Sequence, residues 1–289
     1  MESTELIKRV RKIELRTRKI TQQIFSGQYH SAFKGRGMTF SEVREYQYGD
    51  DIRNIDWNVT ARFNHPYVKM FEEERELTVM LLIDVSRSNQ FGTRNRFKSD
   101  LITELSAVLA FSAISNNDKV GVIFFSNKVE KFMPPKKGRS HILRIIRELV
   151  DYKPVESKTD ISEALRYLTN AIKKRCTTFL LSDFIDDNYE QAIRIASNKH
   201  DLVAMQILDE GDDKLPEVGM ILVKDPETGT THYLDTMDKK VKKNYQDWWQ
   251  KQYQKSLEQF KKAGVDHVQL YTHKDYVQSL TALFKRRGA

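Results

Sequence analysis

The stretch from Thr78 to Ser88 places an unbroken apolar run directly before a carboxylate and two hydroxyls. The run from Val79 to Ile83 is typical of a buried parallel strand, which is apolar on both faces. In an open α/β sheet, ligands bind at the carboxyl ends of the strands. Asp84, Ser86 and Ser88 offer one charged and two neutral oxygens there, a ligand set that suits Mg²⁺. The same residues also suit a strand-to-helix turn that only caps backbone amides.

From Thr78 onward, apolar strands alternate with amphipathic helices, which predicts a parallel sheet with crossover helices on both faces. The predicted strands are 78–84, 119–125, 177–181, 202–208 and 265–270, and the predicted helices are 97–114, 141–150, 161–174, 189–198, 239–263 and 274–284. A strand at 128–133 is expected to form a hairpin with 119–125, before a loop at 134–138. The fold class is therefore α/β, with a Rossmann-like, mostly parallel sheet.

An insertion at about 209–235 interrupts this alternation. Two short apolar runs, 220–223 and 231–234, predict a β-hairpin, because turn-forming residues join them. The acidic turn Asp209–Asp213 before it lacks the length and spacing of an EF-hand loop. We expect that turn to be solvated.

The residue pattern of the chain changes near residue 76. Residues 77–289 carry the alternating pattern, and residues 1–76 form an N-terminal segment. A basic amphipathic helix is predicted at 3–25, with apolar residues every three or four positions. We favour docking of its apolar stripe on the chain's own domain over binding to anionic lipid or to an acidic partner.

Residues 35–62 place acids, arginines and aromatic residues close together. This pattern suits interlocking Arg–carboxylate pairs stacked on rings. Two interpretations stay open: a recognition surface, or an internal polar network that holds the segment to the main domain. We favour the network. The glycines at Gly35 and Gly37 are not a dinucleotide fingerprint, since the third glycine and the preceding strand are missing.

Composition limits the classes of protein that the chain can represent. In its 289 residues, no stretch approaches the roughly 20 apolar residues of a membrane span, and the start lacks the apolar core of a signal peptide. The single cysteine, Cys176, lies in an apolar run and is expected to be buried and inert. We therefore expect a cytoplasmic protein. The net charge of +8 directs attention to acidic partners, nucleic acid or anionic membranes.

Three loops are predicted to meet at one edge of the sheet. Asp84-x-Ser86-x-Ser88 ends one strand, Ser182-Asp183 ends another, and Lys158-Thr159-Asp160 lies directly before a helix. Together they would place hydroxyls and carboxylates around a small cation. Asp160 is expected to cap the helix that it precedes. Because Asp84 lies at the sheet rim, we expect its removal to abolish partner binding and to leave the fold intact.

These loops resemble the metal-ion-dependent adhesion site of the von Willebrand factor type A domains. That motif is Asp-x-Ser-x-Ser, then a Thr, then an Asp, and residues 75–289 match it in chain order with Asp84, Ser86, Ser88, Thr159 and Asp183. The resemblance implies a Mg²⁺ site, with Mn²⁺ or Ca²⁺ as alternatives. An Asp or Glu of a protein partner would fill its open coordination position.

The N-terminal segment resembles the signature of the bacterial DUF58 proteins. The residues that carry this resemblance include Arg44, Tyr46, Gly49, Asp50, Asp51, Arg53, Asp56, Trp57 and Arg62. The resemblance implies a non-enzymatic, metal-dependent protein-binding module. The resemblance further implies that the module would work with a MoxR-type AAA+ ATPase in assembling or activating other complexes, through a client protein that the resemblance does not define.

Two other functions compete with this interpretation. A phosphatase-like hydrolase could use Asp84 as a nucleophile, but Ser86 stands where such enzymes need a second carboxylate. A nucleic-acid-binding protein would explain the charge, but its basic residues are spread out without an aromatic-interleaved motif. The predicted partner-contact residues are Arg87, Lys136, Lys137, Arg139 and Asp160. No small-molecule substrate is expected.

Overall fold

A computed structural model describes residues 7–8, 10–17, 20, 38–73, 77–92, 96–154, 158–224 and 230–288. The described chain divides into two compact units. Residues 34–77 delimit the smaller unit, and the described residues between 7 and 20 group with residues 78–289. The division therefore differs from the predicted one, in which all of residues 1–76 formed a single segment.

A six-stranded sheet is the centre of the larger unit as described, with strand order β10-β7-β6-β3-β4-β5. Its strands are β3 (Thr78–Asp84), β4 (Lys119–Phe125), β5 (Val129–Lys136), β6 (Thr177–Ser182), β7 (Asp201–Leu208) and β10 (Asp266–Tyr271). All neighbours pair in parallel except β4 and β5, which form an antiparallel hairpin. The predicted mostly parallel sheet is thus confirmed.

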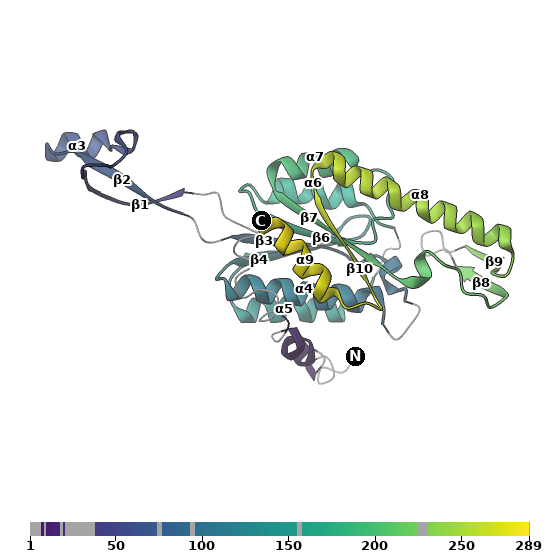
Figure 1. Cartoon of the computed structure of the whole chain (residues 1–289). Helices are drawn as coiled ribbons and strands as arrows, with labels where there is room; N and C mark the ends of the chain where they lie inside the picture. The colour runs from purple at the N-terminus through teal and green to yellow at the C-terminus, as the bar shows by residue number, and fades with distance from the viewer. Residues whose placement is uncertain are drawn as a thin grey trace. The chain divides into compact units, whose positions relative to one another are not determined.

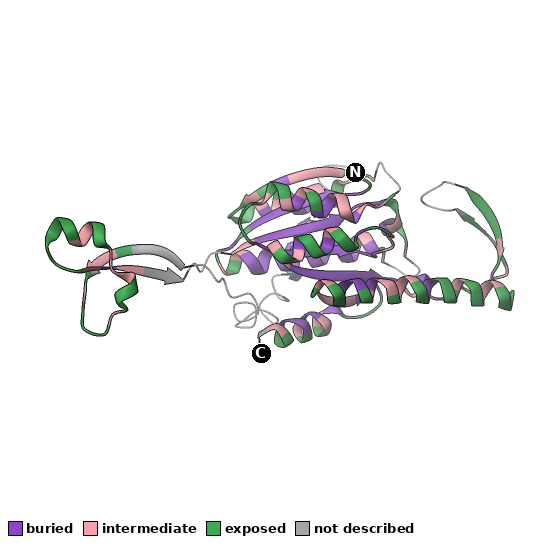
Figure 2. Ribbon diagram, turned by 90° about the horizontal axis from the view of Figure 1, so that it is seen from above, coloured by how far each residue is buried: buried purple, intermediate pink, exposed green. Residues whose placement is uncertain are grey.

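Helices cover both faces of this sheet (Figure 1). One face carries α4 (Lys98–Ser115), α5 (Arg139–Asp151) and α9 (Tyr276–Gly288), and the other carries α6 (Ile161–Ala171), α7 (Glu190–Lys199) and α8 (Lys239–Ala263). The four inner strands β3, β4, β6 and β7 are buried between these layers (Figure 2). Helix α4 is apolar around most of its circumference because neighbouring elements enclose it.

Strand β5 extends further than predicted. It runs through Pro134 and Pro135 to Lys136, where a loop was expected. A proline cannot donate a hydrogen bond to a sheet, and an edge strand tolerates it because one side of the strand has no neighbour. Strand β5 lies at the edge of the sheet, and its pairing with β4 is irregular at the prolines and resumes at Lys136.

The predicted hairpin insertion is confirmed as β8 (Met220–Lys224) paired with β9 (Thr231–Asp235). A hydrogen bond joins the two ends of this hairpin, because the Thr236 hydroxyl, just after β9, donates to the Gly219 carbonyl, just before β8, at 2.7 Å. Several large apolar side chains of this insertion are exposed, among them Met220, Leu222 and Tyr233.

The smaller unit is a hairpin that carries short helices. Strands β1 (Met38–Glu45) and β2 (Tyr67–Glu73) pair antiparallel, and η1 (Ile52–Asn54) and α3 (Trp57–Phe63) lie between them in the chain. Arg44 pairs with Asp50 at 2.7 Å, and Arg53 pairs with Asp51 at 2.8 Å.

Asp56 caps α3 by accepting from the amides of Asn58 and Val59, and it lies 3.5 Å from the Lys69 ammonium. Gly49 has a φ of +106°, which favours glycine. These signature residues therefore build the unit itself. Trp57 and Arg62 are exposed on it, and Gly35 and Gly37 lie outside the described residues.

Residues 10–17 of the predicted N-terminal helix are helical, and both of its predicted ends lie outside the described residues. Val10 and Glu14 are buried against the larger unit, and Arg11 and Lys12 are exposed. The Arg139 guanidinium lies 2.7 Å from a Glu14 oxygen, and Arg16 pairs with Glu104 at 2.9 Å. Ion pairs thus add to the apolar contact that was predicted.

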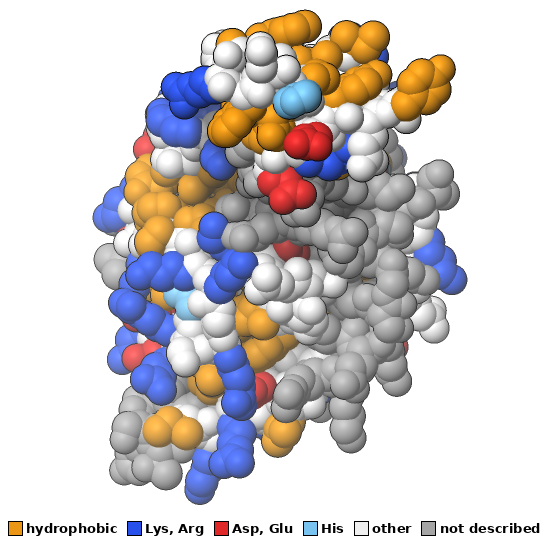
Figure 3. Space-filling view, turned by 90° about the vertical axis from the view of Figure 1, so that its left-hand side faces the viewer, with side chains coloured by type: hydrophobic (Ala, Val, Ile, Leu, Met, Phe, Trp, Pro, Cys, Tyr) orange, Lys and Arg blue, Asp and Glu red, His pale blue; other side chains and the backbone are white. Residues whose placement is uncertain are grey.

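Lys and Arg side chains gather along one side of the face shown in Figure 3, with apolar side chains between them. Lys136 and Lys137 are exposed at the end of β5 and just beyond it. Arg139, the first residue of α5, is exposed but engaged by Glu14. Contact of these residues with a partner stays a prediction.

His200 is a buried histidine whose ring should make stability depend on pH. Its Nδ1 lies 3.2 Å from the thiol of Cys176, which is buried as predicted. Burial, with the charges of Lys199 and Arg175, lowers the pKa of His200 from 6.5 to about 4. The unfolded chain therefore binds a proton below about pH 6.5 that the folded chain takes up only near pH 4. This contribution to stability is present above pH 6.5 and is lost as the pH falls toward 4.

We expect His200→Gln to be less stable than the wild type at pH 7, and the difference between them to shrink by about 2–3 kcal/mol by pH 4. Urea unfolding of both proteins at pH 7, 5.5 and 4 measures this difference. A difference that stays constant over the three pH values would contradict it.

Candidate functional site

The candidate site lies where the order of the sheet reverses. Strands β3 and β6 are parallel neighbours, and the chain leaves β3 for β4 on one side before it returns to β6 on the other. Such a switch point leaves a crevice at the carboxyl ends of the two strands, because their connections run to opposite sides. Asp84 ends β3, and Asp183 directly follows β6.

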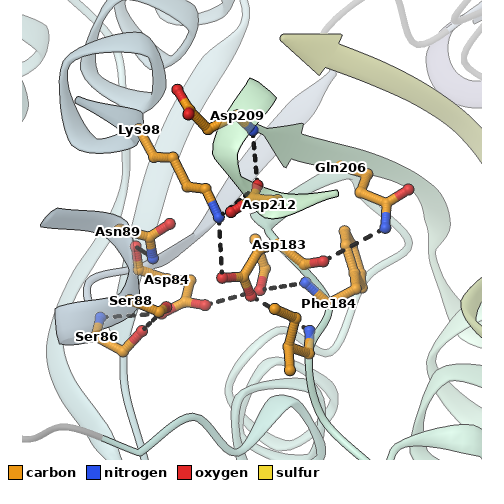
Figure 4. Close-up of polar contacts among 12 residues, drawn as sticks. Asp84, Ser86, Ser88, Asn89, Lys98, Asp183, Phe184, Gln206, Asp209 and Asp212 are labelled. Carbon is orange, nitrogen blue, oxygen red and sulfur yellow. Dashed lines mark hydrogen bonds and ion pairs between the residues drawn. The ribbon is translucent and has the colours of Figure 1, made fainter. Parts of the chain in front are cut away.

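Asp84 is held from several sides (Figure 4). Its Oδ1 accepts from the Ser86 amide at 2.9 Å, and its Oδ2 accepts from the Ser182 hydroxyl at 2.7 Å. The hydroxyls of Ser86 and Ser88 lie 2.9 Å apart, and the Asn89 side-chain amide donates to the Asp84 carbonyl. Backbone and side-chain contacts thus fix the whole Asp-x-Ser-x-Ser loop.

Asp84 is more deeply buried than expected for a residue at a sheet rim, with 1% of its surface exposed. Replacing it by alanine would leave two buried donors without their acceptor, which costs stability. We therefore expect Asp84→Ala to destabilise the fold, in contrast to the sequence-based expectation that the fold tolerates the removal of Asp84. An asparagine keeps the size and one acceptor oxygen, so Asp84→Asn is the better test of function.

Asp183 brings a second buried carboxylate to the same edge. Its Oδ1 accepts from the Ile185 amide at 3.3 Å, whereas its Oδ2 accepts no hydrogen bond from the described residues. Burial and the negative charge of Asp183 raise the pKa of Asp84. Two carboxylates in a low-dielectric site favour a cation that would offset their repulsion.

This donor set fits a small divalent cation. Asp84, Asp183 and the hydroxyls of Ser86 and Ser88 are all oxygen donors, which Mg²⁺ prefers. Asp183 Oδ2, which accepts no hydrogen bond from the described residues, offers lone pairs to it. Within the described ranges, no group of three or more His, Cys, Asp or Glu side chains could hold a metal. The carboxylates available here are two, and the neutral hydroxyls would have to complete the protein's share of the ligands.

Thr159, the fifth motif residue, lies in the loop before α6. The amide of Asp160 donates to the Ser126 carbonyl at 2.8 Å, which places this loop beside the end of β4. Thr159 lines a depression with Asn127 and Asp186, and the described contacts do not join it to Asp84 or Asp183. Its role as a ligand therefore stays a prediction.

The neighbouring acids serve the backbone. Asp160 caps α6 by accepting from the Glu163 amide at 2.9 Å, as predicted. Asp186 accepts from the amides of Ile161 and Asn188. Asp186 thus acts as a local cap.

Lys98 is the residue that the sequence patterns missed. It is the first residue of α4, and 2% of it is exposed. Its ammonium lies 2.9 Å from Asp212 Oδ2 and 3.6 Å from Asp183 Oδ2 (Figure 4). Burial would lower the pKa of Lys98, but the charges of Asp183 and Asp212 outweigh it and raise the pKa. The ammonium therefore persists at neutral pH.

The acidic turn that holds Lys98 was expected to be solvated, and this expectation is wrong. Asp209 and Asp212 are buried around η3 (Glu210–Asp212). Asp212 accepts from the Asp209 amide at 2.7 Å, and Asp209 accepts from the Thr272 hydroxyl at 2.5 Å. The position of the turn in the sequence could have indicated this burial. The turn directly follows β7, so it lies at the same carboxyl edge of the sheet as the motif.

A pocket of about 280 Å³ opens beside Asp84, between the start of α4 and the end of α5. Besides Asp84, Ser86 and Asn89, most of its walls are apolar, including Val85, Phe97, Ile102, Leu149, Val150 and Tyr152. The pocket is large enough for one apolar side chain next to the carboxylate. Arg87 of the same loop is exposed.

Comparisons with known sequences identify relatives of this chain. A family model described as "Protein of unknown function DUF58" matches residues 42–255. An uncharacterized protein of Mycobacterium tuberculosis is 29% identical over 232 residues, which are 79% of this chain and 73% of that protein. The uncharacterized protein YeaD of Bacillus subtilis is 30% identical over 112 residues, 38% of this chain and 25% of that one.

Solved structures resemble a large part of this chain. BatB from Bacteroides thetaiotaomicron, a conserved hypothetical protein, is 14% identical with a TM-score of 0.50, covering 73% of this chain and 98% of that one. The VWA domain of SpRpn10 is 10% identical with a TM-score of 0.42, covering 73% and 95%. The likeness to BatB agrees with the predicted α/β fold with a mostly parallel sheet. In the described part of the chain, no helix is both long and apolar enough to cross a membrane. Because the family match runs from β1 into α8 and covers most of the chain, this protein belongs to the DUF58 family.

Proposed function

We propose that this protein is a non-enzymatic, metal-dependent module that binds an acidic residue of a protein partner. The observation that carries the proposal is the buried pair Asp84 and Asp183 at the switch point, where Asp183 Oδ2 accepts no hydrogen bond from the described residues. Mg²⁺ bound there would present an electropositive coordination position to an Asp or Glu side chain. Asp84, Ser86, Ser88 and Asp183 would hold the metal, with Thr159 as the further candidate.

The residues around the pair suit reversible binding. Hydrogen bonds already hold the Asp84 carboxylate and the two serine hydroxyls in place, so little ordering is needed when a ligand arrives. Two carboxylates hold a divalent cation weakly, and a partner's carboxylate would strengthen the site. Metal and partner would thus bind more tightly together than either does alone.

The pocket beside Asp84 suggests what else the partner presents. Its apolar walls would accept a bulky apolar side chain near the partner's acidic residue. A MoxR-type AAA+ ATPase and its client are the partners we propose, on the basis of the DUF58 family. The module would act in assembling or activating other protein complexes.

A co-purification experiment tests this function. The full chain is immobilised as wild type and as Asp84→Asn, and each is exposed to the MoxR-type ATPase of the same organism in Mg²⁺ and in EDTA. We expect retention of the ATPase by the wild type in Mg²⁺ alone, and a loss of at least roughly tenfold in the variant or in EDTA, because a charged metal ligand is removed.

Asp187→Asn is the matched control, because Asp187 is an exposed acid near Asp183 that pairs with Lys255 on the surface. It should retain the ATPase as the wild type does. Equal retention by wild type and Asp84→Asn, in both Mg²⁺ and EDTA, would refute a metal-dependent contact.

A further inference from the structure

Lys98 places a permanent cation beside the candidate metal ligands. Its side chain is buried with two acids that come from different loops: Asp183 follows β6, and Asp212 lies in the turn after β7. The ammonium is at hydrogen-bond distance from Asp212, at 2.9 Å, and at 3.6 Å from Asp183. Asp183 thus receives positive charge without a hydrogen bond to its Oδ2.

We infer that Lys98 is the residue that sets the affinity of this site for divalent cations, and that Asp212 holds it back from Asp183. This inference rests on the proposed metal centre. The ammonium offsets the charge of Asp183, so a divalent cation gains less from binding beside it. Asp212 takes the direct hydrogen bond, which leaves the lone pairs of Asp183 Oδ2 available to the metal.

The arrangement makes tight metal binding depend on the partner. With Lys98 in place, Asp84 is the one motif carboxylate that no described cation contacts within ion-pair distance. A partner's carboxylate would supply the negative charge that Lys98 offsets. The site would therefore hold the metal loosely between partners and firmly in a complex.

Two substitutions should change the affinity for Mg²⁺ in opposite directions: one removes the Lys98 ammonium, and the other removes the charge of Asp212, which holds it. Lys98→Met removes the charge and keeps the length of the stem, so Mg²⁺ should bind roughly 10- to 100-fold more tightly, the range of effects from residues that contact metal ligands. Asp212→Asn weakens the hold on Lys98, which would then move onto Asp183 Oδ2. Mg²⁺ should consequently bind less tightly than in the wild type.

The experiment is isothermal titration of Mg²⁺ into the metal-free full chain, as wild type, Lys98→Met and Asp212→Asn. Lys255→Met, which removes an ammonium that pairs with Asp187 at the surface, is the control for loss of charge and should bind as the wild type does. Tighter binding by Lys98→Met with weaker binding by Asp212→Asn supports the inference. Binding by Lys98→Met when the wild type shows none supports it as well.

Other outcomes separate this inference from the proposed function. If the wild type binds Mg²⁺ and Lys98→Met binds it equally or less tightly, the inference is wrong and the metal centre stands. If neither binds Mg²⁺, the metal centre is wrong and the inference falls with it. If Lys98→Met does not fold, Asp212→Asn decides: weaker binding supports the role of Lys98, and unchanged or tighter binding overturns it.

Discussion

Replacing Phe184 by alanine is expected to lower the free energy of unfolding by about 3–5 kcal/mol, the usual cost of truncating a buried phenylalanine. Phe184 is 1% exposed, and its ring packs edge-on against Phe260, with 4.9 Å between centroids, and against Tyr189. It directly follows Asp183, so loss of this anchor should also weaken Mg²⁺ binding. Urea unfolding followed by circular dichroism measures the first effect, and titration calorimetry measures the second.

The backbone at Phe184 offers an internal comparison. Its φ is +59°, a left-handed conformation that costs a non-glycine residue about 1–2 kcal/mol. Phe184→Gly removes this strain, so it should be no less stable than Phe184→Ala although it buries less surface. Ile195→Ala, at a position 50% exposed on α7, is the control and should change stability by about 0.5 kcal/mol or less. A loss of only about 0.5 kcal/mol or less in Phe184→Ala would contradict the prediction that packing of the Phe184 ring stabilises the fold.

Lys98→Met is expected to destabilise the metal-free protein by about 3–5 kcal/mol, because removing one partner of a buried ion pair leaves the other uncompensated. Here two acids, Asp183 and Asp212, lose their cation. Addition of Mg²⁺ should restore part of this loss in Lys98→Met and stabilise the wild type less, since ligand binding to the folded state adds stability. Urea unfolding in EDTA and in Mg²⁺ measures both effects.

The ion pair of Lys255 and Asp187 at the surface provides a control for this prediction. Lys255→Met should cost at most about 1 kcal/mol, because exposed ion pairs contribute little. A loss at Lys98 no larger than the loss at Lys255 would mean that the buried acids are neutral or rearranged in the folded protein.

Most of the elements and the motif loops could be predicted from the sequence. An apolar run such as Val79–Ile83 is a local signal, since burial on both faces of a parallel strand forces it. The position of Asp84 and Asp183 at one edge followed from the rule that parallel strands share a carboxyl edge. The ends of elements were less certain, as the prolines within β5 illustrate.

The pattern and spacing of residues in the sequence determined the α/β order, the hairpin insertion and the motif at the strand ends. Each of these features depends on residues that are neighbours in the chain. The tertiary structure alone decided the burial of Asp84, the separate grouping of residues 34–77 and the position of Lys98 between Asp183 and Asp212. A lysine at a helix start and an acidic turn both look solvated in sequence. Their charges become buried because α4 and the loops after β6 and β7 meet at one edge, where each charge offsets the desolvation of the other.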